Sequence, residues 1–129
     1  MGNRSSSRPT DAELEILSVL WRNGPGTVRD VHAAINALKP TGYTTVLKFL
    51  QIMIDKGLVR RDESERAHVY EARFGQEQTQ RQLLDDLLER AFEGSASKLV
   101  MQALSSEKAT TEELAEIKRL LKKAERGAK

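Results

Sequence analysis

The side chains most able to do chemistry are hydroxyl, amine and amide groups that follow Gly42 in the chain. Thr44, Lys48, Gln51 and Asp55 recur at intervals of four, three and four residues, which places them on one side of a helix. Threonine methyl groups can contact thymine methyl groups, while threonine hydroxyls and lysine amines can reach base edges or phosphates. The spacing therefore predicts a helix face that contacts a DNA duplex.

The helix that would position these groups lies between two turn signals. Pro40 and Gly42 mark a turn before it, and Gly57 stands where a glycine commonly follows a helix C-terminus. The other side of the helix carries an apolar stripe, formed by Val46, Leu50, Met53 and Ile54. This stripe is expected to pack in a core and to leave the hydroxyl-bearing side exposed.

Two earlier helices are predicted from their first turns. Thr10 and Glu13 form a capping box before one helix, and Thr27 with Asp30 begins the next. Leu14, Leu17, Leu20 and Trp21 give the first helix an apolar side, and the second carries one as well. Arg29 and His32 are expected at the solvent-exposed surface of the second helix, with no second metal ligand near His32.

After Gly57 the hydrophobic pattern changes to a period of two. It predicts strands over Leu58–Asp62 and Ala67–Phe74 around a turn. A helix-turn-helix followed by such a hairpin is the winged-helix arrangement, so the fold class is mainly α (α+β). Residues 10–75 would form this domain, after a disordered arm over residues 1–9. The alternative is a small α+β core without a role in nucleic-acid binding.

Residues 76–126 are predicted to be a helical region that makes a homodimer. Amphipathic helices are expected over Gln76–Phe92, over Ser95–Leu104 and from a capping box at Thr110 onward. Their apolar faces have too little surface to form a core of their own, so they would pack against a second chain or back onto the winged helix. The first alternative makes these the dimerisation residues: Leu84, Leu87, Leu88, Phe92, Leu99, Leu114, Ile117, Leu120 and Leu121.

Composition excludes several classes of function. The 129 residues contain no cysteine and two histidines, and no glycine-rich phosphate loop is present, so we expect no enzyme, no cofactor and no metal site. The net charge is +2, and residues 1–74 carry all of it, with 11 Lys/Arg against 9 Asp/Glu. No apolar run is long enough to span a membrane and no signal peptide is recognisable, so a cytoplasmic location is expected.

The candidate DNA-binding residues fall into three groups. Thr44, Thr45 and Lys48 would face bases or phosphates, with Thr41 and Tyr43 anchoring the DNA backbone at the helix entrance. Thr27 and Arg29 would hold phosphates from the second helix, and the wing would use Arg60, Arg61 and Arg66. Among these, Arg66 is expected to reach DNA while the wing carboxylates point away. The rival interpretation is a winged-helix module that binds a protein and no DNA.

The sequence resembles the penicillinase-repressor family, the BlaI/MecI/CopY group of bacterial transcriptional regulators. The resemblance covers roughly Pro9 to Leu121. Its matching segments are Glu13-Leu14-Glu15-Ile16-Leu17, Leu20-Trp21, Tyr43-Thr44-Thr45-Val46-Leu47, Lys56-Gly57-Leu58-Val59 and Arg66-Ala67-His68-Val69-Tyr70. It implies a winged-helix homodimer that represses promoters by binding dyad operators.

The chain also departs from this family in ways that bear on signalling. Copper-responsive members carry C-terminal cysteines, and this chain has none, so the resemblance does not extend to copper sensing. In antibiotic-responsive members, a membrane sensor-protease pathway ends in cleavage of the repressor, usually at an Asn-Phe pair. This chain has Gln102-Ala103 at that place. A sensor-protease pathway is thus a partner that the resemblance implies, without the usual cleavage pair.

Overall fold

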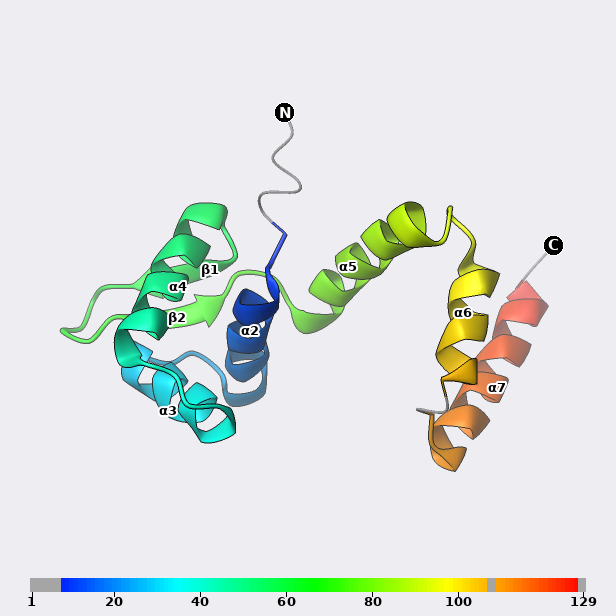
Figure 1. Cartoon of the computed structure of the whole chain (residues 1–129), viewed down its shortest axis with the longest axis horizontal. Coiled ribbons are helices and arrows are strands. Elements are labelled where there is room, and N and C mark those ends of the chain that lie inside the picture. The colour runs from blue at the N-terminus through cyan, green and yellow to red at the C-terminus, as the bar shows by residue number, and fades with distance from the viewer. Residues whose placement is uncertain (1–7, 107–108, 128–129) are drawn as a thin grey trace. The chain divides into compact units, whose positions relative to one another are not determined.

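The computed structural model describes residues 8–106 and 109–127 and is mainly helical, with one two-stranded antiparallel sheet (Figure 1). The predicted α+β fold class is confirmed. The described chain forms two compact units that divide between Leu83 and Leu84, inside α5. The elements in order are α2 (Asp11–Asn23), α3 (Val28–Leu38), α4 (Tyr43–Lys56), β1 (Val59–Asp62), β2 (Val69–Ala72), α5 (Gln76–Ala91), α6 (Ala96–Ser105) and α7 (Thr111–Gly127).

Helices α2 and α3 begin at the two predicted capping boxes. The Thr10 hydroxyl accepts the Glu13 N–H, and the Glu13 carboxylate accepts the Thr10 N–H in return. Thr27 and Asp30 repeat this exchange at the start of α3. Each pair satisfies two backbone donors that a helix N-terminus leaves without an intrahelical partner, so the two start points are set locally.

The core of the first unit lies where α2, α3, α4 and the hairpin meet. The predicted stripe of α4 supplies its centre, because Val46, Leu50 and Met53 are all buried. Helix α2 contributes Ile16, Leu17, Val19 and Leu20. The rest of the buried cluster comes from α3, from the two strands and from Leu58 just before β1. Trp21 packs at the edge of this core and donates its indole N–H to the Phe74 carbonyl at 3.0 Å.

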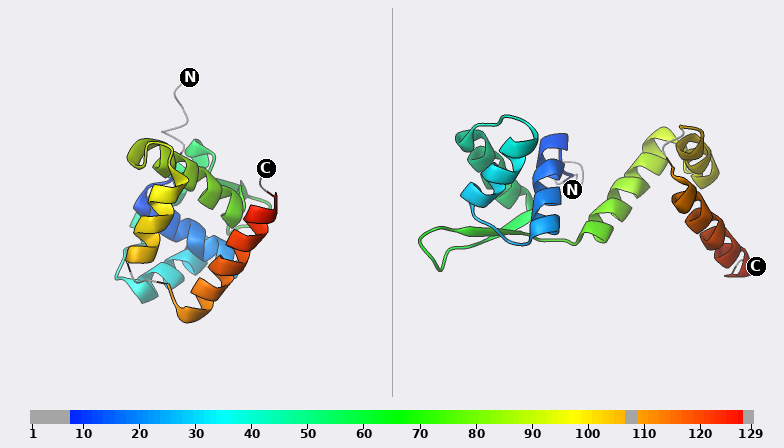
Figure 2. Two further views of the ribbon diagram at one scale, coloured as in Figure 1. Left: turned by 90° about the vertical axis from the view of Figure 1, so that its right-hand side faces the viewer. Right: turned by 90° about the horizontal axis from the view of Figure 1, so that it is seen from below.

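The hairpin is shorter than the sequence pattern predicts, and its loop extends past the three helices (Figure 2, right). Its strands pair in the register Val59↔Ala72, Arg60↔Glu71, Arg61↔Tyr70 and Asp62↔Val69. Leu58 lies outside the ladder because its N–H is bonded to Met53 at the end of α4. Tyr70 is buried, and its backbone pairs on the other side with Gly26, which joins the sheet to the segment before α3.

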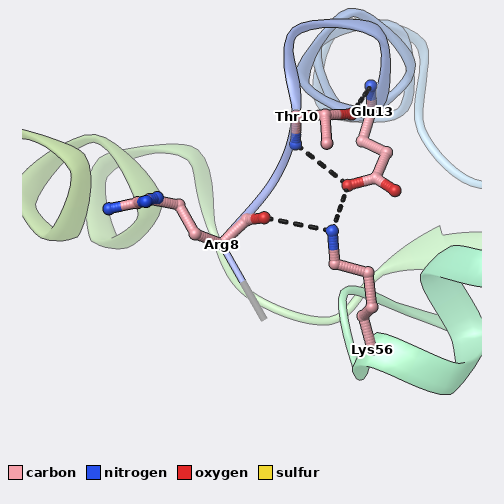
Figure 3. Close-up of polar contacts among 4 residues, drawn as sticks. All are labelled: Arg8, Thr10, Glu13 and Lys56. Carbon is pink, nitrogen blue, oxygen red and sulfur yellow. Dashed lines mark hydrogen bonds and ion pairs between the residues drawn. The ribbon is translucent and has the colours of Figure 1, made fainter. Parts of the chain in front are cut away.

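A partly buried ion pair joins the start of α2 to the end of α4 (Figure 3). Lys56 Nζ lies 2.6 Å from Glu13 Oε1 and donates to the Arg8 carbonyl at 3.1 Å. Only 3% of the Glu13 side chain is exposed. Arg8 and Pro9, the last residues of the predicted arm, therefore have a defined place, whereas residues 1–7 of that arm lie outside the described residues.

The first unit extends eight residues beyond the predicted domain boundary at Gly75. Thr79 on the first part of α5 is buried, with 8% of its surface exposed. The Trp21 bond to Phe74 also fixes the segment that leads into α5. The beginning of α5 thus belongs to the winged helix by packing, which a composition change at Gly75 could not indicate.

The second unit consists of helices without a buried core. Helices α6 and α7 begin within a residue of their predicted starts, at Ser95 as N-cap and at the Thr110–Glu113 capping box. Among the described residues from Leu84 onward, none is buried. Its large apolar side chains are therefore exposed or only half-buried within the unit itself.

Candidate nucleic-acid interface

The exposed side of α4 carries the predicted base-contacting residues. Thr44, Thr45 and Lys48 are all exposed, while Val46 and Leu50 from the same helix are buried. Gly42 precedes the helix and provides no side-chain hydrogen bond to its first turn, unlike the threonines before α2 and α3. The first N–H groups of α4 are thus open to an external acceptor, and the helix dipole favours an anionic one.

The turn before α4 is held by two side chains of α3. Asn36 Oδ1 accepts the Thr41 N–H at 2.9 Å, and His32 Nε2 lies 2.8 Å from the Thr41 carbonyl oxygen. The His32 ring also meets the Tyr43 ring edge-on, with 5.7 Å between centroids. The expectation that His32 is simply solvated is wrong, because folding brings the turn back onto the His32 side of α3.

At the start of α3, Thr27 and Arg29 differ in how accessible their side chains are to a DNA phosphate. Thr27 is half-buried, and its hydroxyl oxygen already accepts the Asp30 N–H at 3.1 Å. The hydroxyl hydrogen stays free to donate to a phosphate oxygen. Arg29 is exposed, and its guanidinium forms no ion pair within residues 8–106 and 109–127. Arg29 is therefore the more accessible of the two side chains and the only one of them that carries a positive charge.

The three wing arginines lie in different environments. Arg61 donates to Glu63 from two nitrogens at 2.7 Å, and a hydrogen bond with Tyr70 followed by the Glu63 contact raises the pKa of Arg61. Strand alternation puts Arg60 on the opposite face of the hairpin, across from Glu71. Arg66 is exposed in the loop. Arg60 and Arg61 therefore leave the hairpin on opposite faces, and only Arg61 is already paired with Glu63.

The carboxylates of the wing are partly occupied within the hairpin. Asp62 Oδ1 accepts the Ser64 N–H at 2.9 Å, and hydrogen bonds from Ser64 hold the pKa of Asp62 below its usual value. Glu63 is occupied by Arg61. Glu65 is exposed. The wing thus keeps negative charge close to its arginines, which limits how strongly it can attract a phosphate backbone.

The predicted dimerisation residues are apolar groups that are either half-buried or exposed. Half-buried members are Leu88, Phe92, Leu99 and Ile117, and exposed members are Leu84, Leu87, Leu114, Leu120 and Leu121. More than half of the Leu121 surface, 55%, is open to solvent. Val100, Met101 and Leu104 on α6 are exposed too and were not among the predicted set, although their apolar type was a usable signal.

The described residues offer neither a metal-ligand cluster nor a membrane-spanning helix. Within the described ranges, no three His, Asp or Glu side chains gather in a way that could hold a metal ion. In the same ranges, no helix is both long enough and apolar enough to cross a bilayer.

Comparison with known proteins decides the family. The family model described as penicillinase repressor matches residues 9–123, which is most of the chain. The chain belongs to the penicillinase repressor family. A transcriptional regulator BlaI from two strains of Mycobacterium tuberculosis is 34% identical over 122 residues, covering 94% of this chain and 88% of that protein. A penicillinase repressor from Bacillus licheniformis is 22% identical over 112 residues, covering 87% of this chain and 88% of that one.

Family membership settles the class of protein. Members and relatives are transcriptional regulators, so this chain is a transcriptional repressor and not an enzyme. The winged helix of the first unit is the part of the repressor that carries the exposed α4 face.

Proposed function

We propose that the protein represses transcription as a homodimer that binds a dyad operator, with α4 of each protomer in a major groove. The observation that carries this proposal is the division of α4 into two sides. Val46, Leu50 and Met53 are buried, whereas Thr45 and Lys48 are exposed next to an uncapped helix N-terminus. A rigidly packed helix with hydrogen-bonding groups at its exposed N-terminal half suits base recognition.

The proposed contacts divide into those that specify sequence and those that position the protein. Thr44, Thr45 and Lys48 contact base edges. Thr41, Tyr43 and the open N–H groups of α4 contact phosphates on one side of the groove. The remaining proposed contacts, also to phosphates, come from Thr27, Arg29, Arg60, Arg61 and Arg66. In the wing, Arg60 and Arg66 are favoured over Arg61, because Arg61 already has Glu63 as a partner.

Dimerisation through the second unit completes the proposal. Its exposed leucines give each chain an apolar surface that a second copy would cover, and a twofold dimer presents two α4 helices to two half-sites. Residues 75–129 carry 10 basic and 10 acidic side chains, so this region has no net charge to attract DNA. It is better suited to contact another protein chain.

Signal-dependent cleavage is not part of the proposed function. Gln102 and Ala103 lie inside α6 and are exposed. A protease needs an extended backbone at the bond it cuts, so cleavage there would require α6 to unfold locally. The sensor-protease partner stays an expectation from the family resemblance.

The proposal is tested by selecting duplexes from a random-sequence pool with the full-length protein. We expect an enriched inverted repeat whose half-site centres lie about 10 base pairs, or a multiple of this, apart. Binding to the enriched duplex should then weaken roughly a thousandfold or more between about 50 and 200 mM salt. A protein-interaction module without DNA binding would yield no enriched sequence and no steep salt dependence.

A further inference from the structure

We propose that His32 and Asn36 are positioning residues that hold Thr41 in place for contact with the DNA backbone. Neither is among the residues expected to touch DNA, and their role is to fix the turn between α3 and α4. This inference rests on the proposed function, because it concerns the same interface. It explains why His32 and Asn36 are hydrogen-bonded to Thr41, which the exposed face of α4 by itself does not.

Both backbone groups of Thr41 are bonded by side chains from one face of α3. His32 and Asn36 are four residues apart, which places them one above the other on the helix. Asn36 Oδ1 accepts the Thr41 N–H at 2.9 Å, and His32 Nε2 lies 2.8 Å from the Thr41 oxygen. Since a carbonyl oxygen can only accept, Nε2 must carry the proton in this contact. The Thr41 hydroxyl donates to the Lys39 carbonyl at 2.7 Å, and it would exchange this acceptor for a phosphate oxygen when DNA binds.

The same contacts extend to the start of α4. Tyr43 is its first residue, and the His32 ring meets the Tyr43 ring at an interplanar angle of 68°. Gly42, between Thr41 and Tyr43, contributes no side chain to the turn and no cap to the helix. Without His32 and Asn36, little would restrain this glycine-containing turn, and DNA would have to order it on binding. Prior ordering lowers that cost.

Asn36 can be removed without disturbing the core. It is exposed, whereas Val28, Val31 and Ile35 form the buried side of α3. Asn36→Ala should therefore keep the fold and loosen only the turn. Alanine is also the better helix former, so helix propensity does not oppose the change. Asn23→Ala, at the exposed end of α2, is the matched control because it removes the same side chain outside the turn.

The first measurement needs no DNA. Amide hydrogen exchange in the full-length protein should speed up at Thr41 in Asn36→Ala, since its N–H loses its acceptor. The control Asn23→Ala should leave Thr41 exchange unchanged, and thermal unfolding midpoints of both variants should stay near that of the parent. If Thr41 exchanges at the parent rate in Asn36→Ala, the side chain does not hold the turn, and the inference is overturned.

The second measurement uses a duplex enriched by the full-length protein and a random duplex of equal length. Asn36→Ala and His32→Ala should each weaken binding roughly 5- to 30-fold on both duplexes, because phosphate contacts carry no sequence information. The slope of log affinity against log salt should stay nearly unchanged, because Thr41 is neutral and its contact with a phosphate releases no counterion. His32→Gln keeps an N–H donor and should recover most of the affinity.

Failure of this inference can be told apart from failure of the proposed function. Wild-type protein that binds neither duplex would overturn the proposed function and the inference together. Wild-type protein that binds, with Asn36→Ala and His32→Ala binding equally well, would overturn only the inference. If His32→Gln and His32→Ala lost DNA affinity equally, the side-chain N–H donor at this position would not matter. His32 would then not be a positioning residue.

Discussion

At the scale of single residues, the interface combines side chains that are free with side chains already engaged inside the protein. Thr45 and Lys48 are exposed and have no ion pair or side-chain hydrogen bond among the described residues. Arg61 is exposed too, but its guanidinium is bonded to Glu63. An exposed cation with a partner must exchange that partner for phosphate, so its net contribution to DNA affinity is smaller.

Replacing the free side chains of α4 tests which of them contact bases. Thr45→Ala and Lys48→Ala should each weaken the free energy of operator binding by about 1–3 kcal/mol, because the base loses its contact with the removed side chain. Binding to random duplex should fall much less. Lys98→Ala removes one positive charge from the exposed surface of α6 and is the control for net charge. Equal losses of Lys48→Ala on both duplexes would show that Lys48 contacts phosphate alone.

At the scale of elements, the wing and α4 are each fixed by a polar contact to another part of the first unit. The wing is joined to the segment before α3 by the Gly26–Tyr70 backbone pair, with N–O distances of 2.9 and 2.7 Å. Helix α4 is fixed at its end by the Lys56–Glu13 pair. These contacts set the positions of two elements that would touch one DNA duplex together.

Removing either partner of the Glu13–Lys56 pair should lower stability, and removing Lys56 should lower it more. Lys56→Met leaves the Glu13 carboxylate buried without its cation and should lower the free energy of unfolding by about 3 kcal/mol. Glu13→Gln keeps an oxygen for the Thr10 N–H and leaves Lys56 partly in water, with 19% of its side chain exposed, so it should cost less. Chemical denaturation of both variants and the double variant measures this.

The double variant and a surface pair provide the controls for this prediction. Glu13→Gln with Lys56→Met should be more stable than Lys56→Met alone, since no unpaired charge stays buried. Lys98→Met breaks a pair whose partner Glu93 is exposed and should change stability by less than about 1 kcal/mol. If Lys56→Met were as mild as Lys98→Met, the pair would contribute nothing to holding α4.

Removing the negative charge of Glu63 from the wing should raise the affinity for DNA. Glu63→Gln should strengthen binding to operator and random duplex by roughly two- to fivefold at low salt, since it frees Arg61 and removes a charge that repels phosphate. The gain should shrink as salt rises. Glu125→Gln on α7 removes the same charge from the second unit and should have no such effect. A loss of affinity in Glu63→Gln would mean that Glu63 orients Arg61 for DNA.

At the scale of the whole molecule, the two units would have separate tasks. The first has a complete core, while the second has exposed leucines and no buried residue among those described. In a dimer, two winged helices are joined. Once one of them has bound a half-site, binding of the other is effectively intramolecular, at an effective concentration near millimolar for a short connection. Affinity for a dyad operator should thus depend on residues that never touch DNA.

Removing the second unit tests whether dimerisation and DNA binding belong to different units. A chain ending at Leu83 should be folded and monomeric and should bind operator roughly two to four powers of ten more weakly. A chain ending at Gly75 should also unfold at a lower temperature, because it lacks the buried Thr79. Full-length Ile117→Asp with Leu121→Asp should resemble the Leu83 truncation by placing charges in the apolar surface. Sedimentation with operator titrations measures all three, and dimeric variants with normal affinity would place the dimer contact elsewhere.

The features that sequence alone determined are those set by contacts within a few residues. Capping boxes at Thr10, Thr27 and Thr110, and the stripe of α4, depend on side chains three or four positions apart, so periodicity located the helices within a residue or two. The exposed positions of Thr44, Thr45 and Lys48 followed from the same helical repeat.

Tertiary structure decided the features that join distant segments. Glu13 and Lys56 lie 43 residues apart, and Trp21 and Phe74 lie 53 apart, so no local pattern indicated either contact. Strand alternation could not tell which side of the hairpin is buried, and packing against the helices selected Tyr70. His32 and Asn36 acquired partners only when the turn folded back onto α3, because hydrogen bonds depend on distances in space that spacing along the chain does not specify.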